Sequence, residues 1–254
     1  MVKLYRDSGL DIYEKAHYSH GEHIREVEQM LTWYLRRNTR VLDIGCSGGL
    51  HALEFAWRGF AVTGVDIEPS AIQRAKERSR DQGLDVEFLV IDLEKDDITC
   101  LGKFDFIYSI GNVMSHVRKD LLGNVFRKIR ACLKNEGIFL FDLFIIEAPF
   151  QEEVFENDLK IIWHRSLDGQ TGSIHMDGNF QDFGITQHFE VWGYSIGEVC
   201  RIANLSGFHE VDFSDTLDFS SSRTEKKNPV CLNFRTRIVE GIDFAHLLAG
   251  DSAK

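Results

Sequence analysis

Short apolar runs alternate with segments of helical character along the first 144 residues of the chain. Five of the runs are continuous, as expected for strands that are covered on both faces, and they lie at residues 41–45, 60–67, 86–93, 104–111 and 137–144. Helices are expected before and between them, at residues 21–37, 50–59, 70–83 and 119–133. This alternation predicts an α/β fold, with an open, doubly wound parallel sheet joined by right-handed crossovers.

The pattern changes after Pro149. Three segments alternate apolar and polar residues and therefore predict an antiparallel meander with one solvated face, at 159–167, 172–183 and 185–194. A helix is expected at 195–206, and two further strands at 208–214 and 230–238. The expected organisation is an N-terminal segment 1–39, a core 40–144, an antiparallel insertion 145–194 after the fifth strand, and a C-terminal part 195–254.

Composition narrows the range of functions. The 254 residues are 43% apolar and 27% charged, a balance typical of a globular protein. The formal net charge of −11 disfavours binding to the negatively charged phosphate backbone of a nucleic acid, so no nucleic-acid partner is expected. The five cysteines never form a Cys-x-x-Cys pair, which argues against a zinc ribbon or disulfide framework and favours a cytoplasmic location. Without a signal core or a long apolar run we expect no membrane association, and the oligomeric state stays open, a homodimer included.

The segment VLDIGCSGG at residues 41–49 carries the clearest functional signal, because it places a buried strand directly before a glycine-rich turn. Gly45 and Gly49 allow positive φ angles and a close approach of the backbone to a ligand. In an open α/β sheet this turn lies where ligands bind, at the carboxyl ends of the strands. A dinucleotide is disfavoured because Ser47 and Leu50 interrupt the Gly-x-Gly-x-x-Gly pattern. We therefore expect a ligand without phosphates.

Two carboxylates follow at the ends of the next two strands. Asp66, which stands 23 residues after Asp43, can accept both hydroxyl hydrogens of a ribose. Asp92 can accept from an adenine amino group, with Ile67 and Leu93 on the two faces of the ring. Each feature alone also fits a tight turn, a helix cap or a solvated acid. Their joint placement favours a nucleoside site.

The stretch from VLDIGCSGG through GVDIEPSAIQRAKER, followed by IDL and FDFIYSIGNVMSHV, resembles the class I S-adenosylmethionine-dependent methyltransferases. The resemblance is strong over about residues 40–144. The family's first motif is Asp-x-Gly-x-Gly-x-Gly, which Asp43, Gly45 and Gly49 match, whereas Ser47 replaces the middle glycine. Because the family's sheet ends in a reversed hairpin, the resemblance implies a seven-stranded sheet completed by the last two expected strands.

The same resemblance implies a role for each residue of the cofactor site. Gly45 and Cys46 would line the methionine part of S-adenosylmethionine, or of its product S-adenosylhomocysteine. Ser109 would offer its carbonyl oxygen to the methionine amino group. The implied cofactor-binding set is Tyr13, Tyr18, Asp43, Gly45, Cys46, Gly49, Asp66, Ile67, Asp92, Leu93 and Ser109.

The segments outside the core also take roles from the resemblance. Aromatic residues of segment 1–39 would close over the cofactor, and insertion 145–194 would cover the acceptor. In glycine methyltransferases an arginine at the start of the first helix binds the cofactor's carboxylate. Gly21 stands at that position here, with Arg25 or His23 as substitutes.

The segment SIGNVMSH resembles glycine N-methyltransferases and related small-molecule enzymes, and the Asn-Pro-Pro-Tyr or Asp-Pro-Pro-Tyr signature of base-amino methyltransferases is missing. We expect in-line methyl transfer to a small-molecule acceptor, without a metal, and with an amine favoured over a hydroxyl. His116 is the candidate base or orienting group, and Asn112 is the candidate hydrogen-bonding partner of the acceptor. The alternatives are an RNA or protein methyltransferase and a non-catalytic S-adenosylmethionine-binding protein.

Overall fold

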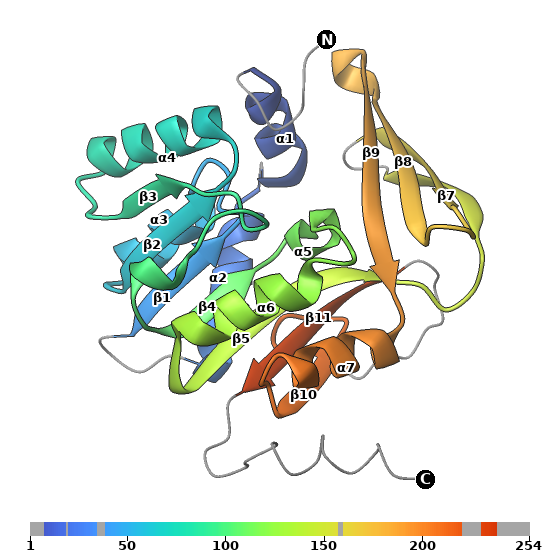
Figure 1. The fold of residues 1–254 in the computed structure, drawn as a ribbon. Helices are drawn as coiled ribbons and strands as arrows, with labels where there is room; N and C mark the ends of the chain where they lie inside the picture. The colour runs from blue at the N-terminus through green and yellow to red at the C-terminus, as the bar shows by residue number, and fades with distance from the viewer. Residues whose placement is uncertain (1–7, 19, 35–38, 157–159, 220–229, 238–254) are drawn as a thin grey trace, which may run out of the picture.

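The structure, a computed structural model, describes residues 8–18, 20–34, 39–156, 160–219 and 230–237. Within these residues the main sheet has the strand order β3-β2-β1-β4-β5-β11-β10 (Figure 1). Strands β1 to β5 run parallel, and β11 runs antiparallel to both β5 and β10. The bounds are β1 (Arg40–Ile44), β2 (Ala61–Asp66), β3 (Glu87–Val90), β4 (Phe104–Ser109), β5 (Leu133–Ile145), β10 (Glu210–Ser214) and β11 (Val230–Arg237). The predicted doubly wound sheet with its reversed hairpin is confirmed, and its seven strands are part of a continuous sheet of eleven.

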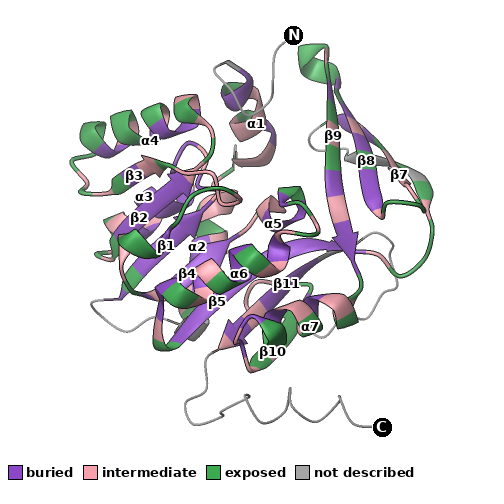
Figure 2. Ribbon diagram, viewed as in Figure 1, coloured by how far each residue is buried: buried purple, intermediate pink, exposed green. Residues whose placement is uncertain are grey.

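Strand β4 shows why continuous apolar runs form the middle of this sheet. Ile107 belongs to the buried cluster under α6 (Leu122–Cys132) and α7 (Ile196–Leu205). Phe106 and Tyr108 belong to the opposite cluster, under α2 (Glu22–Tyr34), α3 (Leu50–Trp57) and α4 (Pro69–Asp81). Figure 2 shows the result: the central strands β1, β2 and β4 are mostly buried, whereas the helices are exposed on their outer faces.

Four antiparallel strands follow β5 along the chain, namely β6 (Gln151–Glu156), β7 (Ile161–Leu167), β8 (Ser173–Phe180) and β9 (Ile185–Tyr194). Strand β9 runs parallel to the carboxyl end of β5, where Gly193 pairs with Phe144. One face of these strands, including Trp163, packs against α1 (Ser8–Tyr18). The predicted antiparallel insertion is confirmed, but β6 was not predicted because half of its sequence QEEVFE is acidic.

The weak periodicity near the N-terminus does not predict helix α1, which ion pairs hold in place against α4. Arg74 Nη1 donates to Asp11 Oδ1 at 2.6 Å, and Arg78 donates to the two carboxylate oxygens of Glu14 at 2.7 and 2.6 Å. Glu14 also lies against Gly48, where any Cβ would collide with its carboxylate. Helix α1 therefore lies over the glycine turn that follows β1.

Other elements end within a few residues of their expected positions. Strand β3 ends at Val90, whereas the apolar run predicted a strand to residue 93. Helix α2 ends at Tyr34, and residues 35–37 of the predicted helix lie outside the described residues. Of the helices that the structure describes, none is long and apolar enough to cross a membrane.

Candidate active site

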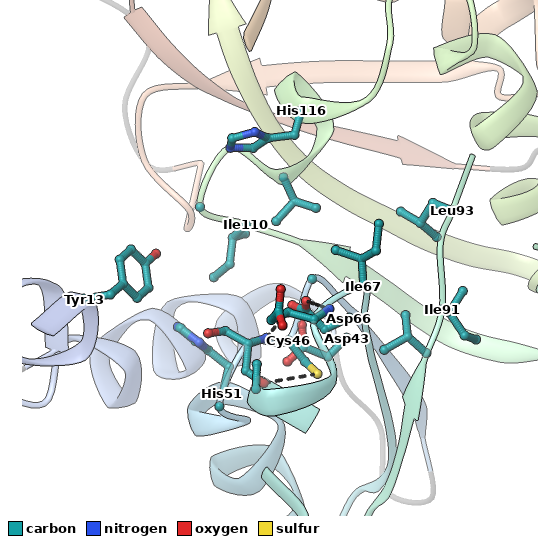
Figure 3. Close-up of a pocket in the computed structure, with 18 of the residues that line it drawn as sticks. Tyr13, Asp43, Cys46, His51, Asp66, Ile67, Ile91, Leu93, Ile110 and His116 are labelled. Carbon is teal, nitrogen blue, oxygen red and sulfur yellow. Dashed lines mark hydrogen bonds between the residues drawn. The ribbon is translucent and has the colours of Figure 1, made fainter. Parts of the chain in front are cut away.

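A cavity of about 700 Å³ lies at the carboxyl ends of β1, β2, β3 and β4. Helix α1, the short helix α5 (Val113–His116) and strand β9 contribute its other walls (Figure 3). The lining residues are arranged side by side across the sheet in the order of the strands that carry them. Strands β3 and β2 supply one end, β1 the middle, and β4 with β9 the far end. An elongated ligand across the strand ends would meet these groups in turn.

The turn after β1 forms the floor of the cavity. Gly45 and Gly49 have φ angles of 78° and 81°, and Ser47 has a φ of 49°, which few non-glycine residues adopt. Gly45 lines the cavity, and Val113 of α5 fills the space where a Cβ would stand. Gly49 is not part of the lining, because it faces the Phe88 ring, whose nearest atom would lie 2.9 Å from a Cβ. The structure thus gives the two predicted glycines different tasks, contact with the cavity and close packing of α3.

Asp66, at the end of β2, lines the cavity and also holds the turn. Its Oδ2 accepts the N–H of Ser47 at 2.8 Å, and its Oδ1 accepts the N–H of Glu68 at 2.9 Å. Each carboxylate oxygen keeps a further lone pair for a ligand hydroxyl. Burial raises the pKa of the Asp66 carboxyl, although these backbone N–H donors act in the opposite direction. Asp66 is therefore a turn anchor and a candidate ribose ligand at once.

Apolar side chains and Asp92 form the end of the cavity beside β3. Ile67 is 62% exposed, and Ile91 and Leu93 line the same end (Figure 3). A large apolar side chain exposed inside a cavity is typical of a surface that a ligand covers. Asp92 accepts from Lys95 Nζ at 2.6 Å, and this hydrogen bond holds the pKa of the Asp92 carboxyl below its usual value. The four predicted adenosine residues, Asp66, Ile67, Asp92 and Leu93, all line the cavity.

Buried polar atoms without partners mark the middle of the cavity. Among the described residues, Asp43 Oδ2 and Ser47 Oγ are buried without a hydrogen bond, and both residues line the cavity. Burial raises the pKa of Asp43 to about 7, although His51 and Tyr108 act in the opposite direction. Burial also raises the pKa of the Cys46 thiol beside them, so this thiol stays protonated. Unsatisfied buried groups of this kind fit a polar ligand, such as the amino-acid part of the predicted cofactor.

Asp43 makes the stability of the protein depend on pH in a predictable direction. A carboxyl whose pKa is raised from 3.8 to about 7 binds its proton more tightly in the folded state, so stability falls as pH rises between these values. We expect Asp43→Asn to melt at a higher temperature than the wild type at pH 8. Its advantage should grow by roughly 2–3 kcal/mol between pH 5 and pH 7 and level off above.

Thermal unfolding of the protein without ligand at pH 5, 6, 7 and 8 measures this effect. Asp182→Asn is the control, because Asp182 is an exposed acid paired with Lys160 at 3.0 Å. The interpretation of Asp43 as a buried, destabilising carboxylate fails if both variants follow the wild type at every pH.

Two predicted residues near the fourth strand stay outside the cavity. Ser109 is fully buried, and its Oγ donates to the Ile44 carbonyl at 3.0 Å. Asn112 precedes α5 with a φ of 63°, and its N–H donates to Asp142 Oδ1 at 2.7 Å. Neither residue lines the cavity. Asp142, which the sequence analysis did not select, also accepts the Gly111 N–H at 2.9 Å and so fixes the turn that carries α5.

His116, at the end of α5, does line the cavity, as do the two predicted tyrosines of α1, Tyr13 and Tyr18. The His116 ring is open to the cavity, and its centroid lies 6.3 Å from that of Phe189 on β9. The surrounding protein withdraws the ring from bulk water, and this lowers the pKa of His116 below its ordinary value. A neutral imidazole at this position is able to accept a proton from a ligand.

Sequence reasoning missed several residues of the lining. They include Glu14 on α1, His51 on α3 and Gln187 on β9. The alternating pattern of β9 predicts which of its side chains share a face of the strand. Nothing in the sequence indicates that this strand lies beside α5, which precedes it by some 70 residues. Among the residues that the structure describes, no three histidine, cysteine, aspartate or glutamate side chains form a group suited to a metal ion.

The fold and the site define a class. A doubly wound sheet with a reversed final hairpin, a glycine turn after β1 and acids after β2 and β3 around one cavity are the arrangement of class I S-adenosylmethionine-dependent methyltransferases. Residues 41–137 match the family model described as a methyltransferase domain. The predicted class and its cofactor are thereby confirmed, whereas the narrower likeness to glycine N-methyltransferases stays a prediction.

Individual proteins show the same similarity. The ubiquinone biosynthesis O-methyltransferase of Histophilus somni (strain 2336) is 27% identical over 145 residues, which are 56% of this chain and 58% of that protein. An S-adenosylmethionine-dependent methyltransferase of Clostridium acetobutylicum ATCC 824 has a TM-score of 0.69 and 16% identity, over 91% of this chain and 98% of that one. An amino pentose methyltransferase of Micromonospora echinaspora, solved with S-adenosylmethionine bound, has a TM-score of 0.62 and 16% identity, over 94% and 100%. The two structures share the fold, and the chain spans 58% of the length of the curated relatives that it matches first.

Proposed function

We propose that the chain is an enzyme that transfers a methyl group from S-adenosylmethionine to a small-molecule acceptor by in-line displacement. One observation supports this most directly: a single cavity connects a nucleoside-like end, at Asp66, Ile67 and Leu93, with a second end lined by His116. When bound, S-adenosylmethionine supplies an electrophilic methyl group on a sulfonium. A cavity with two such ends has room for a donor and an acceptor side by side.

The residues at the cofactor end have separate tasks in this proposal. Asp66 accepts hydrogen bonds from the ribose hydroxyls, and Ile67 and Leu93 cover the adenine faces. The unpaired Oδ2 of Asp43 accepts from the ammonium group of the amino-acid part. Glu14 helps to anchor α1 over the glycine turn through Arg78 and so excludes water from the cofactor.

The residues at the acceptor end align the acceptor and receive its proton. His116 in its neutral form accepts that proton, in keeping with the lowered pKa of the ring. Tyr13 and Tyr18 of α1 keep their proposed role at the cofactor end: burial raises their pKa values, so their hydroxyls stay protonated and can donate to the cofactor. Asn112 does not line the cavity, so in this proposal it does not contact the acceptor directly. It contributes by forming, with Gly111, the turn that precedes α5.

An amine is the favoured acceptor on electrostatic grounds. The described lining contains one lysine, Lys95, against six acids, Glu14, Asp43, Asp66, Glu68, Asp92 and Glu94. Such a cavity attracts a cationic ammonium from solution, which then has to lose its proton before it can attack. A hydroxyl acceptor is the second candidate, because the relative in Histophilus somni is named as an O-methyltransferase.

Titration calorimetry with S-adenosylmethionine, S-adenosylhomocysteine and NAD tests the cofactor part of the proposal. We expect both sulfur compounds to bind and NAD to give no heat. Binding of NAD with no response to either sulfur compound would overturn the proposal. A filter-binding assay with tRNA, expected to be negative, addresses the nucleic-acid alternative.

Transfer itself is tested with labelled S-adenosylmethionine against amines, amino acids and phenols. Methylation within one of these groups is expected. Tight cofactor binding without transfer to any of them would instead favour a protein substrate or the non-catalytic alternative.

A further inference from the structure

His51 occupies a position in the cavity that the proposed function has not yet used. It lies in the first turn of α3, lines the cavity and is buried. Its ring centroid is 5.3 Å from that of Tyr18, and its charge influences the buried carboxyl of Asp43. His51 Nε2 lies 2.6 Å from Glu26 Oε2 of α2. Within the described residues this is the hydrogen bond that the ring makes, and Nδ1 has no partner.

The order of the strands assigns this part of the cavity to the amino-acid end of the cofactor. Asp66 and Leu93 mark the adenosine end, beside β2 and β3. Asp43 and His51 lie beside β1 and α3, on the other side of the Gly45 turn. The amino-acid part carries an ammonium and a carboxylate. Asp43 suits the ammonium, and the carboxylate requires a positively charged or doubly donating group.

The other basic residues nearby are either paired with other groups or do not line the cavity. Arg25, a candidate from the sequence, points outward and donates to the His20 carbonyl at 3.1 Å and to Glu22 at 3.3 Å. Lys95 is the one lysine or arginine in the described lining, and it pairs with Asp92 at the adenosine end. His23, the second candidate, is not part of the lining, and burial lowers its pKa and so disfavours the charged ring.

We infer that His51 binds the carboxylate of the cofactor through Nδ1–H, while Glu26 orients the ring by accepting Nε2–H. The inference rests on the proposed cofactor. An imidazolium donates from both nitrogens, so two carboxylates on opposite sides of the ring satisfy it completely. A carboxylate partner on the outer nitrogen fixes the plane of a histidine ring and so aims the inner one. His51 is a binding residue in this arrangement, and Glu26 is a positioning residue that acts through it.

Three ligands distinguish a specific loss of carboxylate binding from a general loss of binding at the site. S-Adenosylhomocysteine carries the carboxylate. Its decarboxylated analogue, S-adenosyl-3-thiopropylamine, keeps the adenosine, the sulfur and the amine. Methylthioadenosine lacks the whole amino-acid part. Calorimetric affinities for all three are measured with the wild type, His51→Ala, His51→Gln and Glu26→Gln, and no acceptor or turnover is needed.

We expect His51→Ala and His51→Gln to bind S-adenosylhomocysteine about tenfold to a hundredfold more weakly than the wild type, the effect of losing one charge-assisted hydrogen bond. Both variants should keep their affinities for the two ligands without a carboxylate within about twofold. Glu26→Gln should show the same selectivity with a smaller loss. His164→Ala is the matched control, because His164 is also paired with a carboxylate, that of Glu153 at 3.1 Å, but does not line the cavity.

The outcomes are distinguishable. Equal losses for all three ligands in both folded His51 variants, or no loss for any of them, would overturn the role of His51. If His51→Ala does not fold, His51→Gln alone tests the role of His51, because its amide can still donate to Glu26. If the wild type itself binds none of the three ligands, the proposed function fails, which is a different result.

Discussion

Replacement of His116 by alanine is expected to lower turnover by about 10²–10⁴ if the acceptor is a hydroxyl, because His116 then removes the acceptor's proton during methyl transfer. The ring lines the cavity at the end opposite the adenosine residues, and its partial withdrawal from bulk water lowers its pKa. An amine that has already lost its proton before transfer needs only to be oriented. For such an acceptor the loss should be smaller, and the pH profile should follow the amine.

The pH dependence has a defined sign. Protonation removes the lone pair of His116, so the rate of the wild type should fall as pH decreases through the pKa of this ring, below the ordinary value of about 6.5. His116→Ala should lack this acidic limb. His175→Ala is the control, since His175 is exposed on β8 and does not line the cavity. A rate within about twofold of the wild type on the true acceptor would leave alignment alone as the source of catalysis.

The central part of the fold could be predicted because both faces of its strands are covered. The run FDFIYS of β4 places apolar residues on both faces of the strand, so these few consecutive residues are enough to predict that the strand is buried. Helix α1 had no such signal, because its place depends on Asp11 and Glu14 meeting arginines of α4 more than 60 residues away. Strand β6 likewise depends on pairing with β7 and not on its own acidic sequence.

The two ends of the cavity differ in the same way. Asp66, Ile67, Asp92 and Leu93 stand directly after strands, so a parallel sheet brings them to one edge whatever the rest of the chain does. The opposite end combines α1, α5 and β9, whose relative positions follow from tertiary packing. Ser109 and Asn112 show the limit within a single segment. Their place after β4 could be predicted, but the sequence does not show that Ser109 Oγ donates to the Ile44 carbonyl or that the Asn112 backbone N–H donates to Asp142.

Replacement of Asp66 by alanine is expected to weaken the binding of S-adenosylhomocysteine at least about tenfold, because two hydrogen bonds from the ribose to a carboxylate are lost, each of about 1.5–3 kcal/mol. The sequence alone gives Asp66 no partner in the protein and so predicts little change in stability. The structure changes that expectation, since Asp66 also accepts the N–H groups of Ser47 and Glu68. Loss of these bonds is offset in part by removal of a partly buried carboxyl whose pKa is raised by its withdrawal from water.

We therefore expect Asp66→Ala to melt about 2–4 °C below the wild type, the effect of roughly 1 kcal/mol in a chain of this size. Asp142→Asn separates stability from binding. Asp142 is also a buried acid that accepts two backbone N–H groups, those of Gly111 and Asn112, but it does not line the cavity. Asp142→Asn should lose stability while it keeps its affinity for methylthioadenosine, which reaches only the adenosine end.

The ribose contact itself is tested with methylthioadenosine and with its analogue that lacks both ribose hydroxyls. The wild type should distinguish the two ligands by at least about tenfold, whereas Asp66→Ala should bind them equally, because its partner for the hydroxyls is gone. Equal discrimination by both proteins would make Asp66 a turn anchor alone. The raised pKa also predicts the direction of the pH dependence. Protonation of Asp66 removes its charge, so the discrimination by the wild type between the two ligands should decrease as pH is lowered through that pKa.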